Sequence, residues 1–223
     1  PLAKPPEQWT EEDLRQMVDE RLEESMWLEL KSDLNLNSES GRREACKDLS
    51  AFANAQGGTI VYGIAEKDTG TGAKVAAELA PLTQPGLKER LEDVVLNGVT
   101  PRFEFTVLTI ASATVNGGYY LVVKVPQSFA GVHMVTLGGT NRYYKRRNFG
   151  AEPMTEEEVR LAYERVLRAR EDARIRYVRD RFNPSRNLFA FQLATVPVYQ
   201  DDRMFDPIRV RPEDLNPDGL LPR

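Results

Sequence analysis

Cysteine and histidine are nearly absent from this sequence. Its 223 residues include one cysteine, Cys46, and one histidine, His133. An internal disulfide needs two cysteines, and the usual zinc sites need several cysteines and histidines together, so both frameworks are excluded. No serine elbow or cysteine pairing with His133 is visible, which argues against serine or cysteine hydrolase chemistry. The scarcity of cysteine indicates a reducing compartment.

Long apolar runs are also missing. No stretch of about 18 apolar residues occurs, as a membrane-spanning helix would require. The start of the chain lacks the basic and apolar segments of a secretory signal. We therefore expect a cytoplasmic protein with no membrane partner. Because the sequence begins at Pro1 rather than at a methionine, we also expect that native residues are missing from it.

An excess of positive charge is absent as well. Lysine and arginine number 30 against 34 aspartates and glutamates, which gives a formal net charge of -4. A surface that binds nucleic acid would therefore have to be a local patch. The 41% hydrophobic content is enough for the core of one large domain.

Periodicity and turn signals predict an α+β fold, a mixed α/β domain with a mixed sheet, a largely antiparallel second half and helices packed on the sheet. Residues 1–182 would form this domain, with an N-terminal helix and a long C-terminal helix. Residues 183–223, rich in proline and aspartate, would be a C-terminal extension or the start of a truncated region, with one strand over 188–198. The predicted helices cover about 10–23, 42–55, 84–97 and 155–181, and the strands 26–31, 59–65, 103–115, 119–125, 132–137 and 141–147.

Three acids lie on predicted strands or at their ends: Glu24, Glu29 and Glu66. Converging carboxylates are the ligands that Mg²⁺ and Mn²⁺ prefer. Period-two alternation places Trp27, Glu29 and Lys31 on one face of the first strand. In many metal-dependent nucleases, the acid of such an acid-x-lysine element binds metal and the lysine stabilises charge at the phosphate. The alternative is a solvated surface ion pair.

The densest basic segment runs from Asn141 to Arg147. Alternation places Arg142, Tyr144 and Arg146 on one face, and Tyr143, Lys145 and Arg147 on the other. Two cations around one ring suit phosphate contacts combined with base stacking. The alternative is an edge strand protected from aggregation by charge. The arginine-rich helix that follows favours a salt-bridged, exposed or dimer-facing role.

Four segments, in this order, resemble the Schlafen-type AlbA-like domain, which is often described as DNA-binding. The resemblance covers about residues 20–165. It depends on Glu24-Ser25 placed five residues before Glu29, on Leu28-Glu29-Leu30-Lys31, on the run from Ala51 to Ile64 (AFANAQGGTIVYGI), and on Arg142-Tyr143-Tyr144-Lys145-Arg146 before Met154-Thr155-Glu156-Glu157-Glu158.

The resemblance implies a mixed α/β fold that binds RNA or DNA. In Schlafen endoribonucleases three acids form a divalent-metal site, and the matching positions here are Glu24, Glu29 and Glu66. Glu66 departs from the family pattern because it follows Ala65 in place of an aspartate pair. The nuclease members join two such halves, so a homodimer would be needed to form a comparable groove. The implied function is a nucleic-acid-binding domain acting as a Mg²⁺- or Mn²⁺-dependent endonuclease, with Lys31 at the phosphate; the alternative is a non-catalytic DNA-binding regulatory or oligomerisation module.

Overall fold

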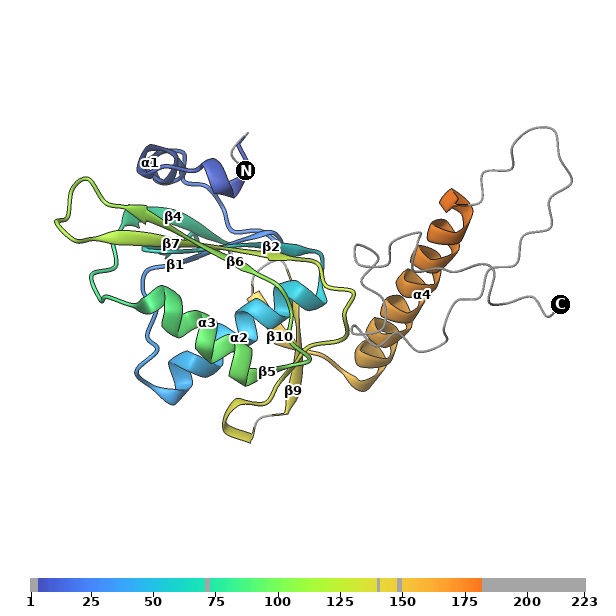
Figure 1. The fold of residues 1–223 in the computed structure, drawn as a ribbon. Coiled ribbons are helices and arrows are strands. Elements are labelled where there is room, and N and C mark those ends of the chain that lie inside the picture. Colours follow the sequence, from blue (N-terminus) through green and yellow to red (C-terminus); the bar gives the residue numbers. More distant parts are fainter. Residues whose placement is uncertain (1–3, 71–72, 140, 148–149, 182–223) are drawn as a thin grey trace, which may run out of the picture. The chain divides into compact units, whose positions relative to one another are not determined.

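The computed structural model describes residues 4–70, 73–139, 141–147 and 150–181, with side chains up to residue 175 (Figure 1). The chain forms two compact units, residues 1–170 and 171–223, and the elements below belong to the first except where α4 crosses the boundary. The predicted extension 183–223, with its strand over 188–198, lies outside the described residues. The predicted boundary after residue 182 stays a prediction.

A four-stranded sheet forms the centre of the first unit. Its order is β1 (Leu28–Lys31), β2 (Gly57–Tyr62), β7 (Tyr119–Pro126) and β6 (Thr106–Ala111). β1 and β2 run parallel, whereas β7 is antiparallel to both of its neighbours. The crossover between the parallel pair is α2 (Glu39–Asn54). Its N-cap is Ser38, which accepts a hydrogen bond from the Gly41 N–H, so α2 begins three residues before the predicted start.

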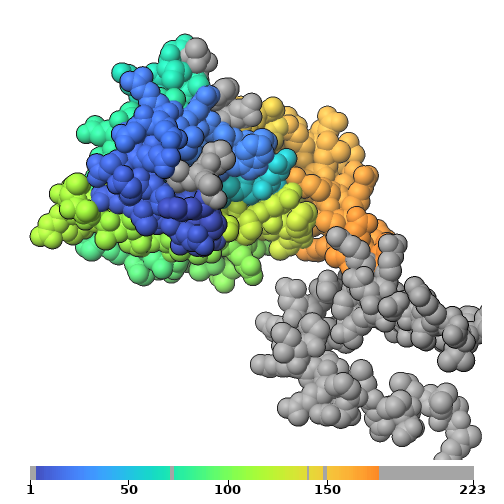
Figure 2. Space-filling view, turned by 90° about the horizontal axis from the view of Figure 1, so that it is seen from above, coloured from blue at the N-terminus to red at the C-terminus, as the bar shows by residue number. Residues whose placement is uncertain are grey.

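Helices cover both faces of this sheet (Figure 1). On β2, Ile60 and Tyr62 pack with residues of α2 and α3 (Leu87–Gly98), while Val61 packs with residues of α1 (Glu11–Asp19). This alternation follows from the period of two residues in a strand. Seen from the side of α1, the N-terminal segment covers much of its face of the sheet (Figure 2).

The predicted strand over residues 59–65 is divided into two strands of different sheets. β2 ends at Tyr62, and β3 (Ile64–Asp68) pairs with β4 (Lys74–Leu79). Gly63 lies between them with φ +102°, and a Cβ there would lie 2.7 Å from the Tyr120 ring. The break places Glu66 in the two-stranded sheet. The prediction of one continuous strand over 59–65 was therefore wrong after Tyr62.

A second antiparallel sheet has the order β10 (Gly150–Pro153), β9 (Arg142–Arg147), β8 (Met134–Val135) and β5 (Val99–Thr100). β8 and β9 lie in the predicted strands 132–137 and 141–147, and they pair as an antiparallel hairpin around Gly138-Gly139. The Asn54 side chain at the end of α2 donates to the carbonyls of His133 (2.8 Å) and Tyr144 (2.9 Å). This buried amide ties the second sheet to α2. Two short 3-10 helices are η1 (Pro6–Gln8) and η2 (Leu137–Gly139).

The long helix α4 (Glu156–Arg181) agrees with the predicted helix over 155–181 and begins with a capping box. The Thr155 N–H donates to the Glu158 carboxylate (2.9 Å), and the Glu158 N–H donates to the Thr155 hydroxyl (3.3 Å). Ala162 and Val166 on its first half pack with Val132. These elements confirm the predicted α+β fold. Within the described residues, every helix is too short or too polar to cross a bilayer.

Candidate functional site

Glu29 and Lys31 share one face of β1, as the alternation predicted. The Lys31 ammonium lies 3.0 Å from the Glu29 carboxylate. Leu28 and Leu30 point to the opposite face and join the core beneath α1. Glu29 is only 6% exposed, so the pair is not the solvated surface pair considered as an alternative.

Helix α2 adds two acids to this pair. Asp48 and Glu44 place carboxylate oxygens 3.2 and 3.5 Å from the Lys31 ammonium. Burial raises the pKa of Asp48 to about 6, and the Glu29 charge adds to this, although Lys31 and Lys47 oppose it. Burial alone would lower the pKa of Lys31, but Asp48 and Glu29 raise it above its usual value. Lys31 therefore stays charged inside a ring of carboxylates.

Arg146 of β9 completes the cluster from the other sheet. Its guanidinium donates to the second oxygen of Glu29, and to the carbonyls of Ser25 (3.1 Å) and Leu28 (3.3 Å). The same group lies over the Phe52 ring, 4.8 Å from its centroid. Arg146 is 5% exposed. The prediction that it contacts nucleic acid does not agree with this position, because its donors are directed to partners inside the protein.

Of the other predicted binding residues of β9, one is buried and three are at least partly exposed. Tyr144 is buried in the core that α2 and α3 share, so it is not available as an exposed stacking ring. Arg142 and Arg147 are exposed, and Lys145 is half-buried. Lys145 pairs with Glu158, and Arg147 lies 2.6 Å from Glu152. Arg142 has no ion-pair partner among the described residues.

Glu24 lies just before β1 and is buried. One of its oxygens accepts a hydrogen bond from the Leu30 N–H (2.8 Å). Burial raises the pKa of Glu24 to about 7; the Leu30 N–H opposes the shift, and the nearby carboxylates of Glu66 and Glu29 reinforce it. The charges of the other two predicted acids therefore both act on Glu24.

Glu66 reaches this region from β3. A β-bulge falls between Ala65 and Glu66, where the register with β4 shifts. Across the hairpin, the Glu66 carboxylate pairs with the Lys74 ammonium. The backbone N–H of Glu24 donates to the Lys74 carbonyl (2.9 Å), which keeps β4 beside Glu24.

The three acids do not form a three-ligand metal site as they are arranged. Within the described residues, no three aspartate, glutamate, histidine or cysteine side chains gather closely enough to hold a metal ion. Both oxygens of Glu29 contact cations of the chain instead, and Glu66 is paired with Lys74. Of the predicted ligands, the Glu66 charge raises the pKa of Glu24 more than the Glu29 charge does. Metal binding stays a prediction.

Sequence reasoning missed Asp48 and the inward position of Arg146. For Asp48 a signal was present, because positions 45, 48, 49 and 52 form one helical stripe whose other members are apolar. An acid within such a stripe indicates a buried charge. For Arg146 no signal was available, since alternation shows which residues share a face but not which face is buried.

The fold and these contacts define a mixed α+β domain with a buried charge cluster between its two larger sheets and a basic strand beside it. The family model described as Schlafen, AlbA_2 matches residues 24–155, more than half of the chain, and the chain belongs to this family. The predicted family is thereby confirmed, and membership suggests nucleic-acid binding.

Several solved structures match this chain. Among them is the N-terminal domain of a protein related to ATP-dependent DNA helicase RecG from Nitrosomonas europaea, 20% identical, with a TM-score of 0.44. The similarity covers 62% of this chain and 88% of that one. No curated protein matches the chain.

Proposed function

We propose that this domain binds RNA or DNA through the exposed cations of β9. The observation that carries the proposal is the family match, which spans both the acid cluster and β9. In a chain of net charge -4, four of the six residues of β9 are basic. Arg142 is exposed and has no carboxylate partner among the described residues, so its charge is free to meet a phosphate.

Lys145 and Arg147 would also bind phosphate, once a phosphate replaces the carboxylates with which they are now paired. Arg147 and Glu152 are each more than half exposed in their side chains, and such surface pairs contribute little to stability. A phosphate can therefore replace Glu152 at low cost. Glu158 pairs with Lys145 and also lies 3.6 Å from Arg147. Its single carboxylate is therefore shared between the two cations.

Fluorescence anisotropy tests the proposal directly. Labelled single-stranded RNA, single-stranded DNA and duplex DNA of equal length are titrated with the whole chain at 50 and 200 mM NaCl. Binding to at least one probe, weaker at the higher salt, is expected because phosphate contacts release counterions. An absence of salt-sensitive binding to all three probes would overturn the proposal.

We propose metal-dependent cleavage of the bound strand as a second candidate function. The observation in its favour is that the Glu66 carboxylate helps to raise the pKa of the buried Glu24, since two neighbouring carboxylates favour a cation between them. Against it stands the pairing of Glu29 with Arg146 and Lys31, which leaves that acid without a free oxygen. In this role Glu24 and Glu66 would be the ligands, and Lys31 would face the phosphate.

Cleavage is tested with structured RNA in Mn²⁺, comparing wild type with Glu24→Gln and Glu29→Gln. The nuclease proposal expects activity in the wild type that Glu24→Gln abolishes. Equal residual activity in all three proteins would identify a contaminating nuclease and reject the proposal. A domain that binds without cleaving would correspond to the regulatory alternative.

A homodimer is also proposed, on the evidence of α4. Leu161 and Leu167, on its first half, are 49% and 62% exposed. Exposed leucines on a helix rich in both signs of charge favour contact with a second copy of the chain. A cytoplasmic location remains a prediction from the cysteine content.

A further inference from the structure

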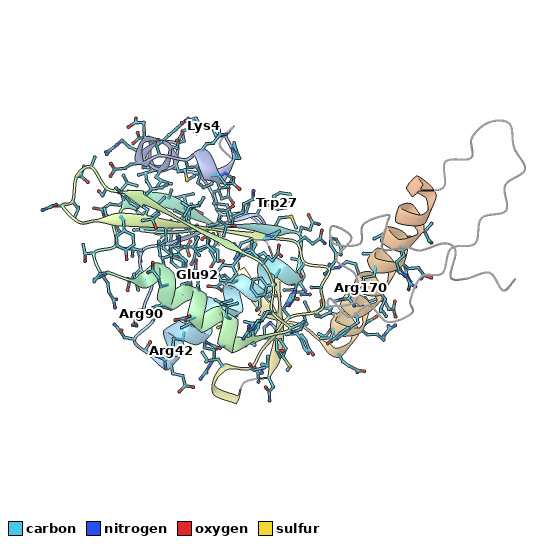
Figure 3. All side chains as sticks on the ribbon, in the orientation of Figure 1. Lys4, Trp27, Arg42, Arg90, Glu92 and Arg170 are labelled. Carbon is cyan, nitrogen blue, oxygen red and sulfur yellow. The ribbon has the colours of Figure 1, made fainter. Side chains whose placement is uncertain are left out.

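Trp27 is an exposed aromatic ring beside the charge cluster. Its side chain is 54% exposed, whereas most large apolar side chains of this unit are buried. The residue lies just before β1, next to the start of β2 (Figure 3). Exposure of so much apolar surface is unfavourable, since removing it from water stabilises the state in which it is covered. An indole that is exposed to solvent beside the charge cluster is suited to contact a binding partner.

The backbone that carries this ring is held in place. The Trp27 N–H donates to the Ser25 hydroxyl (3.2 Å), and the Trp27 carbonyl accepts from the Thr59 N–H (2.8 Å). Ser25 and Leu28 exchange two backbone hydrogen bonds of 3.0 and 3.3 Å across the turn. A ring on a fixed turn loses little conformational freedom when it is covered, which favours binding.

Arg146 connects this turn to the acid cluster. It donates to the carbonyls of Ser25 and Leu28, on either side of Trp27, and also to Glu29. Two residues separate by at most about 7 Å along an extended chain, so Trp27 and Glu29 are close neighbours. Arg142, on the same face of β9 as Arg146, is an exposed cation.

We infer that Trp27 is a stacking platform for an unpaired base of a single-stranded nucleic acid. The inference rests on the proposed nucleic-acid binding and makes it more specific. Bases in a duplex are stacked on one another, whereas an unpaired base exposes a π-face that any aromatic ring can cover. Tyr144, the ring predicted for this role, is buried, so Trp27 takes it in this chain. Single strands would therefore bind better than duplexes.

Tryptophan fluorescence tests this inference, because the chain contains two tryptophans and each can be removed separately. Trp9 is the matched control: it is only partly exposed, packs against the core beneath α1, and donates its indole N–H to the Lys4 carbonyl (3.0 Å). Trp9→Phe, Trp27→Phe and Trp27→Ala are titrated with an unlabelled single-stranded 12-mer. Anisotropy with the labelled 12-mer and with a duplex is measured in parallel, and circular dichroism checks folding.

Binding should quench the fluorescence of Trp9→Phe, which retains Trp27, and leave that of Trp27→Phe unchanged. Trp27→Ala should lose about tenfold in affinity for the single strand and keep its affinity for the duplex, with Trp27→Phe intermediate. Anisotropy that reports binding without quenching in Trp9→Phe would overturn the inference and leave the proposed function standing. If the wild type binds neither probe, the proposed function falls and the inference with it.

Discussion

Arg146 is the residue on which most of the candidate site depends. One guanidinium joins the Glu29 carboxylate, the turn that carries Trp27 and the Phe52 ring, and so links β1 and α2 to β9. A planar group with five donors can make these contacts together, which an ammonium cannot. Its role is to position the charge cluster rather than to meet phosphate.

Removal of Arg146 should therefore destabilise the domain strongly. Arg146→Ala leaves Glu29 buried beside Lys31 alone, and breaking a buried pair on one side costs about 3–5 kcal/mol. Urea unfolding followed by circular dichroism measures the change. Arg142→Ala, on the same strand but exposed, is the control and should change stability by less than about 0.5 kcal/mol. Equal effects of the two variants would show that Arg146 is not buried in a pair.

Glu24 should make stability fall as pH rises. Its pKa is about 7 in the folded chain against an ordinary value of 4.5, so between these values the folded state holds a proton that the unfolded state has lost. The stabilisation is complete below pH 4.5 and is lost as pH rises through 7. Glu24→Gln keeps an acceptor for the Leu30 N–H and removes this dependence.

Urea midpoints at pH 5 and pH 8 check the Glu24 prediction. Glu24→Gln should gain stability relative to wild type at pH 8 and not at pH 5. Glu12→Gln, at an exposed position of α1, is the control that should follow the wild type at both values. A difference between Glu24→Gln and wild type that is the same at both pH values would contradict the assigned shift.

At the scale of the elements, local signals explain what could be predicted. Thr10 and Thr155 each precede an acid by three residues, and capping boxes form there, at the starts of the predicted helices over 10–23 and 155–181. The Gly138-Gly139 hairpin also follows from its turn residues. The predictions that were wrong depended on tertiary contacts. Residues 59–65 form one apolar run in the sequence, but the chain changes direction at Gly63, and the residues after it belong to a different sheet. The faces of β9 were separated correctly, but only packing against α2 decides that the face of Tyr144 and Arg146 is buried.

Gly63 should be intolerant of a side chain for two separable reasons. Its φ is +102°, and an added Cβ would meet Tyr120 at 2.7 Å. Gly117 has φ +72° with open space around it, so Gly117→Ala isolates the backbone cost of about 1–2 kcal/mol. Gly63→Ala should cost at least about 1 kcal/mol more through overpacking. Thermal unfolding of both variants tests this, and equal losses would refute the steric part.

At the scale of the whole molecule, the proposed homodimer should depend on α4. Sedimentation velocity over a tenfold range of concentration is expected to show a species of twice the chain mass, and Leu167→Glu should shift it towards the monomer. The control is Val115→Glu, which adds the same charge at an exposed apolar position of the loop between β6 and β7. A wild type that stays monomeric throughout would reject the homodimer and leave nucleic-acid binding to a single domain.

The central claim is that a chain with net negative charge binds nucleic acid through the exposed cations of β9, and a matched pair of charge reversals tests it most directly. Arg142→Glu changes the proposed surface; Arg15→Glu makes the same change in net charge on α1, which covers the sheet face opposite to α2. Anisotropy with the single-stranded probe is measured for both variants across a series of salt concentrations. The account predicts weaker binding by Arg142→Glu, with a salt slope reduced by about 1, and wild-type binding by Arg15→Glu. Equal losses in the two variants would show that only net charge matters, and would contradict a binding surface on β9.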